Sequence, residues 1–113
     1  MADEEQPFGR KVYGDAWVQF KTSGYPRKLR REWDAADYQG AWAIAARYIE
    51  GGQVADVDGQ AVTLGPGLAL TDLDNVEDAV VSWLFTAFRD FWLTEVTQPR
   101  PNLSRPLATT PTA

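Results

Sequence analysis

The sequence predicts a single α+β domain in which one N-terminal strand and a short β-hairpin pack with three helices, the C-terminal helix being the longest. Three observations predict this class. Apolar and polar residues alternate between Val12 and Lys21, as they do in a half-buried strand. The dipeptide Asp58-Gly59, which favours tight hairpin turns, separates two short apolar runs. Residues 71–96 contain no Gly or Pro and repeat their apolar side chains at helical spacing.

The first strand and the first helix follow from local residue preferences. We expect the strand to contain Gly14 and Asp15 as a bulge or turn. Pro26 suits the first position of a helix, because its missing N–H would be unpaired there in any residue. Three apolar residues at spacings of four and three give this helix a narrow stripe: Leu29, Trp33 and Ala36.

A second helix is expected from Tyr38 to Glu50. Asp37 can cap its N-terminus, and Gly51-Gly52 stands where glycine commonly ends a helix. The short hairpin follows, and Gly65-Pro66-Gly67 then breaks the chain before the last helix.

The long helix, Thr71 to Val96, has an unusually wide apolar face. Asp72 or Asp74 can cap its first turn, and Glu77 and Asp78 place negative charge where the helix dipole is positive. One apolar stripe consists of Leu73, Val76, Val80, Leu84, Ala87 and Phe91. A second stripe beside it consists of Val81, Phe85, Phe88 and Trp92, and together the two span roughly 200°, about twice the arc of an ordinary surface helix.

Such a wide face has two interpretations. Either the helix runs through the middle of the core, or one stripe meets a partner. The remaining apolar material is two narrow helical stripes and about three short strands. We therefore expect Val81, Phe85 and Trp92 to be partly exposed in the monomer and to be covered by self-association or by a client helix.

Composition argues against catalysis. The chain of 113 residues has no cysteine, which excludes disulfides, thiol catalysis and thiolate metal sites. It also has no histidine, the commonest general base and metal ligand. Only carboxylates are left for hydrolytic or metal chemistry. We expect no enzymatic activity and no cofactor or metal.

The segments at the two ends are expected to lie outside the domain. Residues 1–11 are polar and predicted to be flexible, residues 12–98 form the domain, and residues 99–113 are a disordered tail rich in Pro and Thr. The N-terminus does not resemble a signal peptide, and no run of about 18 apolar residues occurs, so a soluble protein of the cytoplasm is expected.

Three short motifs have ordinary explanations. The segment Asp56 to Gly59 is similar to part of a calcium loop, but in that register Val54 and Gly65 occupy the anchoring positions, so a plain turn fits better. Gly65-Pro66-Gly67 is not followed by Lys and Ser or Thr, as a phosphate-binding loop requires. The paired acids near the start of the long helix are explained by its dipole.

A basic cluster in the first turns of the first helix is a better candidate for a functional site than these three motifs. Arg27, Lys28, Arg30 and Arg31 place positive charge where the helix dipole opposes it. They form a solvated face, a surface for an acidic partner, or a nucleic-acid contact. The net charge of −5 argues against general nucleic-acid binding without forbidding a local basic patch.

The order of these features resembles a known group of proteins. An aromatic strand runs into SGYPRKLRREW at residues 23–33, an aromatic helix leads to Tyr48-Ile49-Glu50 and then to Asp56-Val57-Asp58-Gly59, and an acidic helix carries Trp83-Leu84. The pattern, between Val12 and Trp92, is similar to the small tail-assembly chaperones and related tail-region proteins of long-tailed phages of actinobacteria. Its motifs are short.

The resemblance implies a protein-binding function. Such chaperones are not enzymes; they coat the long tape-measure protein, keep it soluble in the host cytoplasm and help the tail tube to polymerise around it. The expected partner is therefore a tape-measure or other tail protein, or a second copy of the chain. Two alternatives stay open: a structural protein of the virion tail or head–tail region, and a small modulator that binds nucleic acid or a host protein through the face from Arg27 to Arg31.

Overall fold

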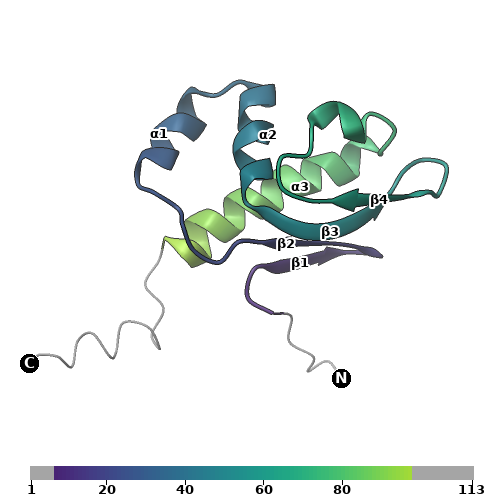
Figure 1. Ribbon diagram of the computed structural model, residues 1–113, viewed down its shortest axis with the longest axis horizontal. Coiled ribbons are helices and arrows are strands. Elements are labelled where there is room, and N and C mark those ends of the chain that lie inside the picture. Colours follow the sequence, from purple (N-terminus) through teal and green to yellow (C-terminus); the bar gives the residue numbers. More distant parts are fainter. Residues whose placement is uncertain (1–6, 98–113) are drawn as a thin grey trace, which may run out of the picture.

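The computed structural model describes residues 7–97, which form a four-stranded antiparallel sheet and three α-helices (Figure 1). The predicted α+β class is confirmed. The strands are β1 (Arg10–Tyr13), β2 (Ala16–Phe20), β3 (Ile49–Ala55) and β4 (Ala61–Leu64), and they lie in the sheet in chain order. The helices are α1 (Lys28–Ala35), α2 (Tyr38–Arg47) and α3 (Asp78–Phe91).

The N-terminal strand of the prediction is a hairpin. Gly14 and Asp15 form the turn between β1 and β2, whose register pairs Tyr13 with Ala16. β1 begins at Arg10, inside the segment that was expected to be flexible. The rest of that segment, residues 1–6, and the predicted Pro- and Thr-rich tail, residues 99–113, lie outside the described residues.

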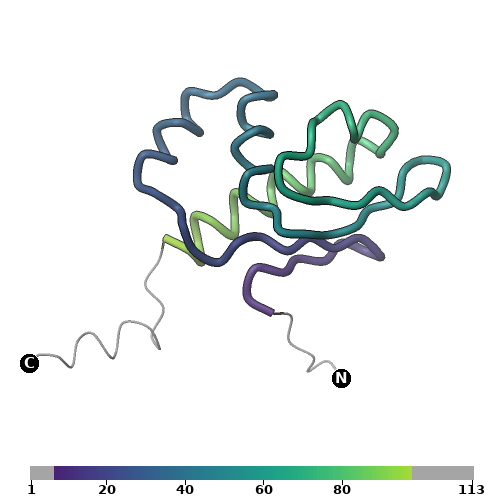
Figure 2. The backbone as a smooth tube through the Cα atoms, viewed as in Figure 1, coloured from purple at the N-terminus to yellow at the C-terminus, as the bar shows by residue number. Residues whose placement is uncertain are grey.

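Between β2 and β3 the chain leaves the sheet to form α1 and α2 and then returns beside β2 (Figure 2). α1 begins two residues after Pro26, whose carbonyl accepts a hydrogen bond from the Leu29 N–H at 3.0 Å. Asp37 caps α2 as predicted, because its carboxylate accepts a hydrogen bond from the Gly40 N–H at 2.7 Å.

The prediction that Gly51-Gly52 ends a helix was wrong, because both glycines lie in β3. α2 ends at Arg47, and β3 begins two residues later. A Cβ atom on Gly52 would stand 2.5 Å from the carbonyl oxygen of Trp17 and 2.9 Å from a methyl group of Leu64. Glycine is required there because the neighbouring strand backbone leaves no room for a side chain.

The long helix is shorter than predicted at its start. Leu70–Leu73 forms a separate 3₁₀ helix, in which the Asp72 carboxylate accepts a hydrogen bond from the Ala69 N–H at 3.1 Å. The prediction that Asp72 or Asp74 caps the long helix was therefore wrong, since α3 starts at Asp78 with Glu77 at the cap position. After Phe91 the helix widens into a π-helical turn, Trp92–Val96.

α3 is the central element of the core. Its Phe88 ring is fully buried and stands 5.6 Å from Phe20 of the sheet, 5.5 Å from Trp33 of α1 and 5.9 Å from Tyr48 at the end of α2. The sheet covers one side of the helix, and the pair α1–α2 covers another. Most of the wide apolar face is therefore buried within the domain itself, while Val80 and Phe85 stay partly exposed.

Candidate functional site

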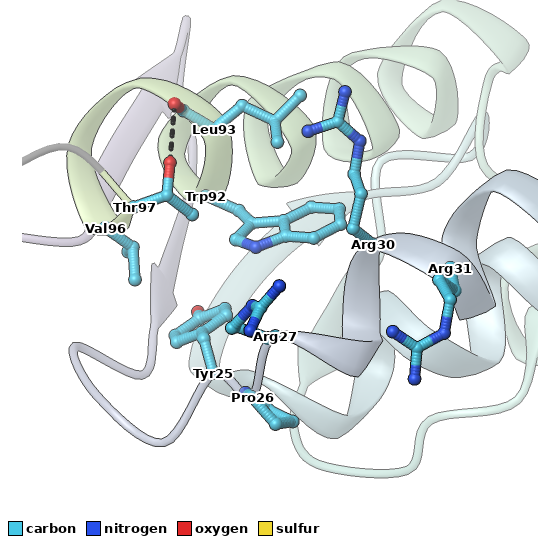
Figure 3. A pocket seen from close by; sticks show the side chains of 9 residues that line it. All are labelled: Tyr25, Pro26, Arg27, Arg30, Arg31, Trp92, Leu93, Val96 and Thr97. Carbon is cyan, nitrogen blue, oxygen red and sulfur yellow. Dashed lines mark hydrogen bonds between the residues drawn. The ribbon is translucent and has the colours of Figure 1, made fainter.

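A hollow between the start of α1 and the C-terminal end of α3 brings together residues from two of the predicted partner surfaces (Figure 3). We call it the arginine hollow. Its volume is about 540 Å³, and its lining comprises Tyr25, Pro26, Arg27, Arg30, Arg31, Trp92, Leu93, Val96 and Thr97. Arginine guanidinium groups and the Trp92 indole, more than 60 residues apart in the sequence, meet at this one place.

The π-helical turn shapes one wall of the hollow. The Thr97 N–H donates to the Trp92 carbonyl at 3.0 Å, a bond that spans five residues, and the Thr97 hydroxyl donates to the Leu93 carbonyl at 2.9 Å (Figure 3). A π-turn widens the helix and is frequently found at functional sites. Here the turn places Leu93 and Val96 beside the indole, so that this wall is apolar.

The opposite wall is basic. Arg27, Arg30 and Arg31 are exposed at the start of α1, which has no acidic residue in its first turn. Within residues 7–97, Arg27 and Arg31 have neither an ion-pair partner nor a side-chain hydrogen bond. Arg30 has only an exposed contact with Asp34 at 3.8 Å, a type of pair that contributes little. All three guanidinium groups are thus available to a ligand.

Tyr25 forms a fixed side of the hollow. Its ring stacks on Tyr48 at 4.3 Å between centroids, and its hydroxyl donates to the Lys21 carbonyl at 2.8 Å. Burial, assisted by the nearby Tyr48 and Glu50, raises the pKa of the Tyr25 hydroxyl well above its usual value. The group stays neutral at physiological pH, so it adds no negative charge to a site that carries three positive ones.

The predicted exposure of Val81 and Trp92 was wrong. Val81 is 5% exposed and Trp92 is 2% exposed, and the Trp92 indole packs on Trp33 at 5.7 Å and on Phe88 at 5.8 Å. The reason is that a sheet of four strands rather than about three covers one side of α3, and Trp33 of α1 packs against Trp92 at its C-terminal end. Trp92 therefore forms the floor of the hollow as a core residue.

Phe85 is partly buried and lies beside a second, smaller hollow. Its ring stacks on Tyr38 at 4.8 Å and lies 5.5 Å from Trp42. The second hollow has a volume of about 290 Å³ and is lined by Trp33, Tyr38, Ser82, Phe85, Thr86 and Arg89. Lys28, the remaining member of the predicted basic cluster, is exposed on α1 but does not line either hollow.

Tyr25, Leu93 and Val96 were missed by the sequence reasoning. Leu93 and Val96 follow Arg89 at spacings of four and three, which places all three residues on one face of the last helix. This spacing was the available signal that Leu93 and Val96 share a surface. Tyr25 stands next to Pro26 in a short loop, and its role depends on a contact with Tyr48 that only the folded chain provides.

The aspartate turn is structural. The Asp56 carboxylate accepts hydrogen bonds at 2.9 Å from the N–H groups of Asp58 and Gln60, and the bond from Gln60 lowers the pKa of Asp56 most. Among residues 7–97, no group of three or more potential ligands is placed to hold a metal ion. In the same part of the chain, no helix has the length and apolar character needed to cross a membrane.

Comparison with protein-family models, curated proteins and solved structures found no match for this chain. The arginine hollow, in which basic and apolar side chains meet, is therefore the candidate site.

Proposed function

We propose that this chain is a non-enzymatic protein-binding module whose arginine hollow takes an acidic segment of a partner protein. The observation that carries the proposal is that three arginine side chains and an apolar wall line one hollow of about 540 Å³. A guanidinium group binds a carboxylate through two parallel hydrogen bonds, a geometry that a lysine ammonium cannot reproduce. The apolar wall adds a place for an aliphatic or aromatic side chain of the partner.

The resemblance of the sequence to phage tail-assembly chaperones supports a more specific proposal. The partner would be the tape-measure protein, which the chain would bind and keep soluble in the host cytoplasm before the tail tube forms. A hollow that combines positive charge with apolar contacts suits an amphipathic helix with acidic residues beside its apolar stripe. Assembly of the tail would then release the bound segment.

Co-expression tests this function. The full chain is produced together with a tape-measure protein of a long-tailed phage, and the soluble fraction of that protein is measured. We expect the wild-type chain to raise the soluble fraction and Arg27→Gln/Arg31→Gln to lose most of this effect. Arg47→Gln/Arg89→Gln, which removes the same positive charge outside the arginine hollow, serves as the matched control.

Two results would contradict the proposal. Equal activity of the two double variants would show that the arginine hollow is not the binding site. Tight binding of the wild-type chain to duplex DNA at physiological salt, lost in Arg27→Gln/Arg31→Gln, would favour the nucleic-acid modulator. Mass spectrometry of purified virions separates a chaperone, which is absent from them, from a structural tail protein, which is present.

A further inference from the structure

Charge is separated along the molecule. The segment from Lys21 to Arg31 contains five basic residues and no acidic one, and it precedes and enters α1. Residues 48–88 contain seven acidic residues and no basic one. Figure 1 shows α1 beside the C-terminal end of α3, whereas the β3–β4 turn lies at the opposite end of the molecule. The arginine hollow therefore lies at the end of the molecule opposite the β3–β4 turn, which contains Asp56 and Asp58. Glu50 is an exception, because it lies near Tyr25 at the side of the hollow.

The acidic end is a defined surface. A hollow of about 330 Å³ between the β1–β2 turn, β3 and the start of α3 is lined by three carboxylates, those of Asp15, Asp56 and Glu77. The Asp56 carboxylate is engaged in its own turn. Within residues 7–97, Asp15 and Glu77 have no ion-pair partner and no side-chain hydrogen bond. This end is joined to the β3–β4 turn by a hydrogen bond from Asn75 to Asp58.

We propose that the arginine hollow of one copy docks the acidic end of a second copy, so that the chains associate head to tail. The inference rests on the proposed function, because it takes the arginine hollow to be a protein-binding site and names its partner. Each copy carries both complementary surfaces at opposite ends. A contact between two different surfaces leaves one of each unsatisfied, and the assembly therefore grows or closes into a ring.

The charges of the two surfaces favour a second copy of the chain as the occupant of the arginine hollow. A second copy carries at least three carboxylates on one compact surface, and the hollow presents three guanidinium groups. Complementary surfaces of this kind steer two molecules into one orientation. Contact between two arginine hollows, or between two acidic ends, would place like charges together. The arrangement therefore favours a head-to-tail contact over a symmetric dimer, and the contact weakens as salt screens the charges.

Sedimentation velocity on the full chain tests the proposal. We expect the weight-average mass of the wild type to rise with concentration and to fall when NaCl is raised from about 0.05 M to about 0.5 M. Arg27→Gln/Arg31→Gln removes the basic surface, and Asp15→Asn/Glu77→Gln removes the acidic one without touching Asp56. Each variant alone should associate at least about tenfold more weakly than the wild type.

Mixing the two variants gives the decisive result. One variant keeps an intact acidic end and the other an intact arginine hollow, so an equal mixture should form a 1:1 complex that does not grow further. Neutral substitutions are used because reversed charges would create a second complementary pair. Arg47→Gln/Arg89→Gln and Glu50→Gln/Asp90→Asn remove equal charge outside both surfaces and should associate as the wild type does.

The proposal is overturned if the wild type stays monomeric at all concentrations, or if the mixed variants do not pair. It is also overturned if the variants associate as strongly as the wild type. The proposed function fails separately. If Arg27→Gln/Arg31→Gln no longer keeps the tape-measure protein soluble while the wild type remains monomeric, the hollow binds an acidic partner but not a second copy.

Discussion

Replacing Trp92 tests whether this residue, at the floor of the arginine hollow, stabilises the fold or binds a partner. The indole is 2% exposed and packs on Trp33 and Phe88, although it also lines the hollow. If it is a core residue, Trp92→Ala destabilises the fold. If Trp92 instead serves mainly to contact a partner, the same change weakens partner binding and leaves the stability of the free chain nearly unchanged.

The expected magnitude follows from its burial. A buried Trp side chain removes about 200 Å² from water, which at about 25 cal/mol/Å² corresponds to an upper bound of about 5 kcal/mol. Substitutions of this kind typically cost about 3–5 kcal/mol. For a domain of this size, a loss of about 3 kcal/mol lowers Tm by at least about 12 °C. Thermal and urea unfolding followed by far-UV circular dichroism measures this change.

The matched control is Arg27→Gln/Arg31→Gln on the rim of the same hollow. Both side chains are exposed, so each substitution should change the free energy of unfolding by no more than about 0.5 kcal/mol. A Trp92→Ala variant that loses less than about 1 kcal/mol would refute the assignment of Trp92 to the core. Its indole would then be free to serve a partner.

Three further changes test separate parts of the fold. Gly52→Ala should destabilise by at least about 1 kcal/mol in urea unfolding, because its Cβ would meet the Trp17 carbonyl; an unchanged midpoint would show that β2 and β3 can move apart. Asp37→Ala should cost about 1 kcal/mol by removing the cap of α2, and Asp37→Asn, which can still accept the bond, is its control. The raised pKa of Tyr25 gives stability that is present below about pH 10, where unfolded tyrosine begins to ionise, and that is lost as the pH rises further. Tyr25→Phe should therefore flatten the fall in Tm above pH 10, and an equally steep fall would contradict the assignment.

Local chemistry predicted the parts of the fold that are decided locally. The Asp58-Gly59 turn joins β3 to β4, and Asp37 caps α2, because a turn dipeptide and a capping carboxylate act on their own neighbours. The prediction that Gly51-Gly52 ends a helix was wrong because glycine is required at residue 52 by the close approach of Trp17 and Leu64. That approach is a tertiary feature. No helical or strand period carries that information.

The candidate site shows the same division. The basic character of Arg27, Arg30 and Arg31 was evident from the sequence, and so was the apolar character of Trp92. Their meeting in one hollow depends on α1 packing across the end of α3, through the contact of Trp33 with Trp92. The burial of Val81 could not be foreseen because it depends on how many strands cover the helix.

The insertion of α1 and α2 between two neighbouring strands has a consequence for folding kinetics. The β1–β2 and β3–β4 hairpins each join residues close in sequence, but β2 and β3 pair only after residues 21–48 are closed into a loop by the hydrogen bond from the Lys21 N–H to the Tyr48 carbonyl. Closing a flexible loop of that length costs about 3 kcal/mol of chain entropy. If α1 and α2 form first, they shorten the effective loop. Folding of this small domain is therefore expected to be limited by the joining of two preformed hairpins, and substitutions at Gly52, where the hairpins meet, should slow it more than substitutions within either hairpin turn.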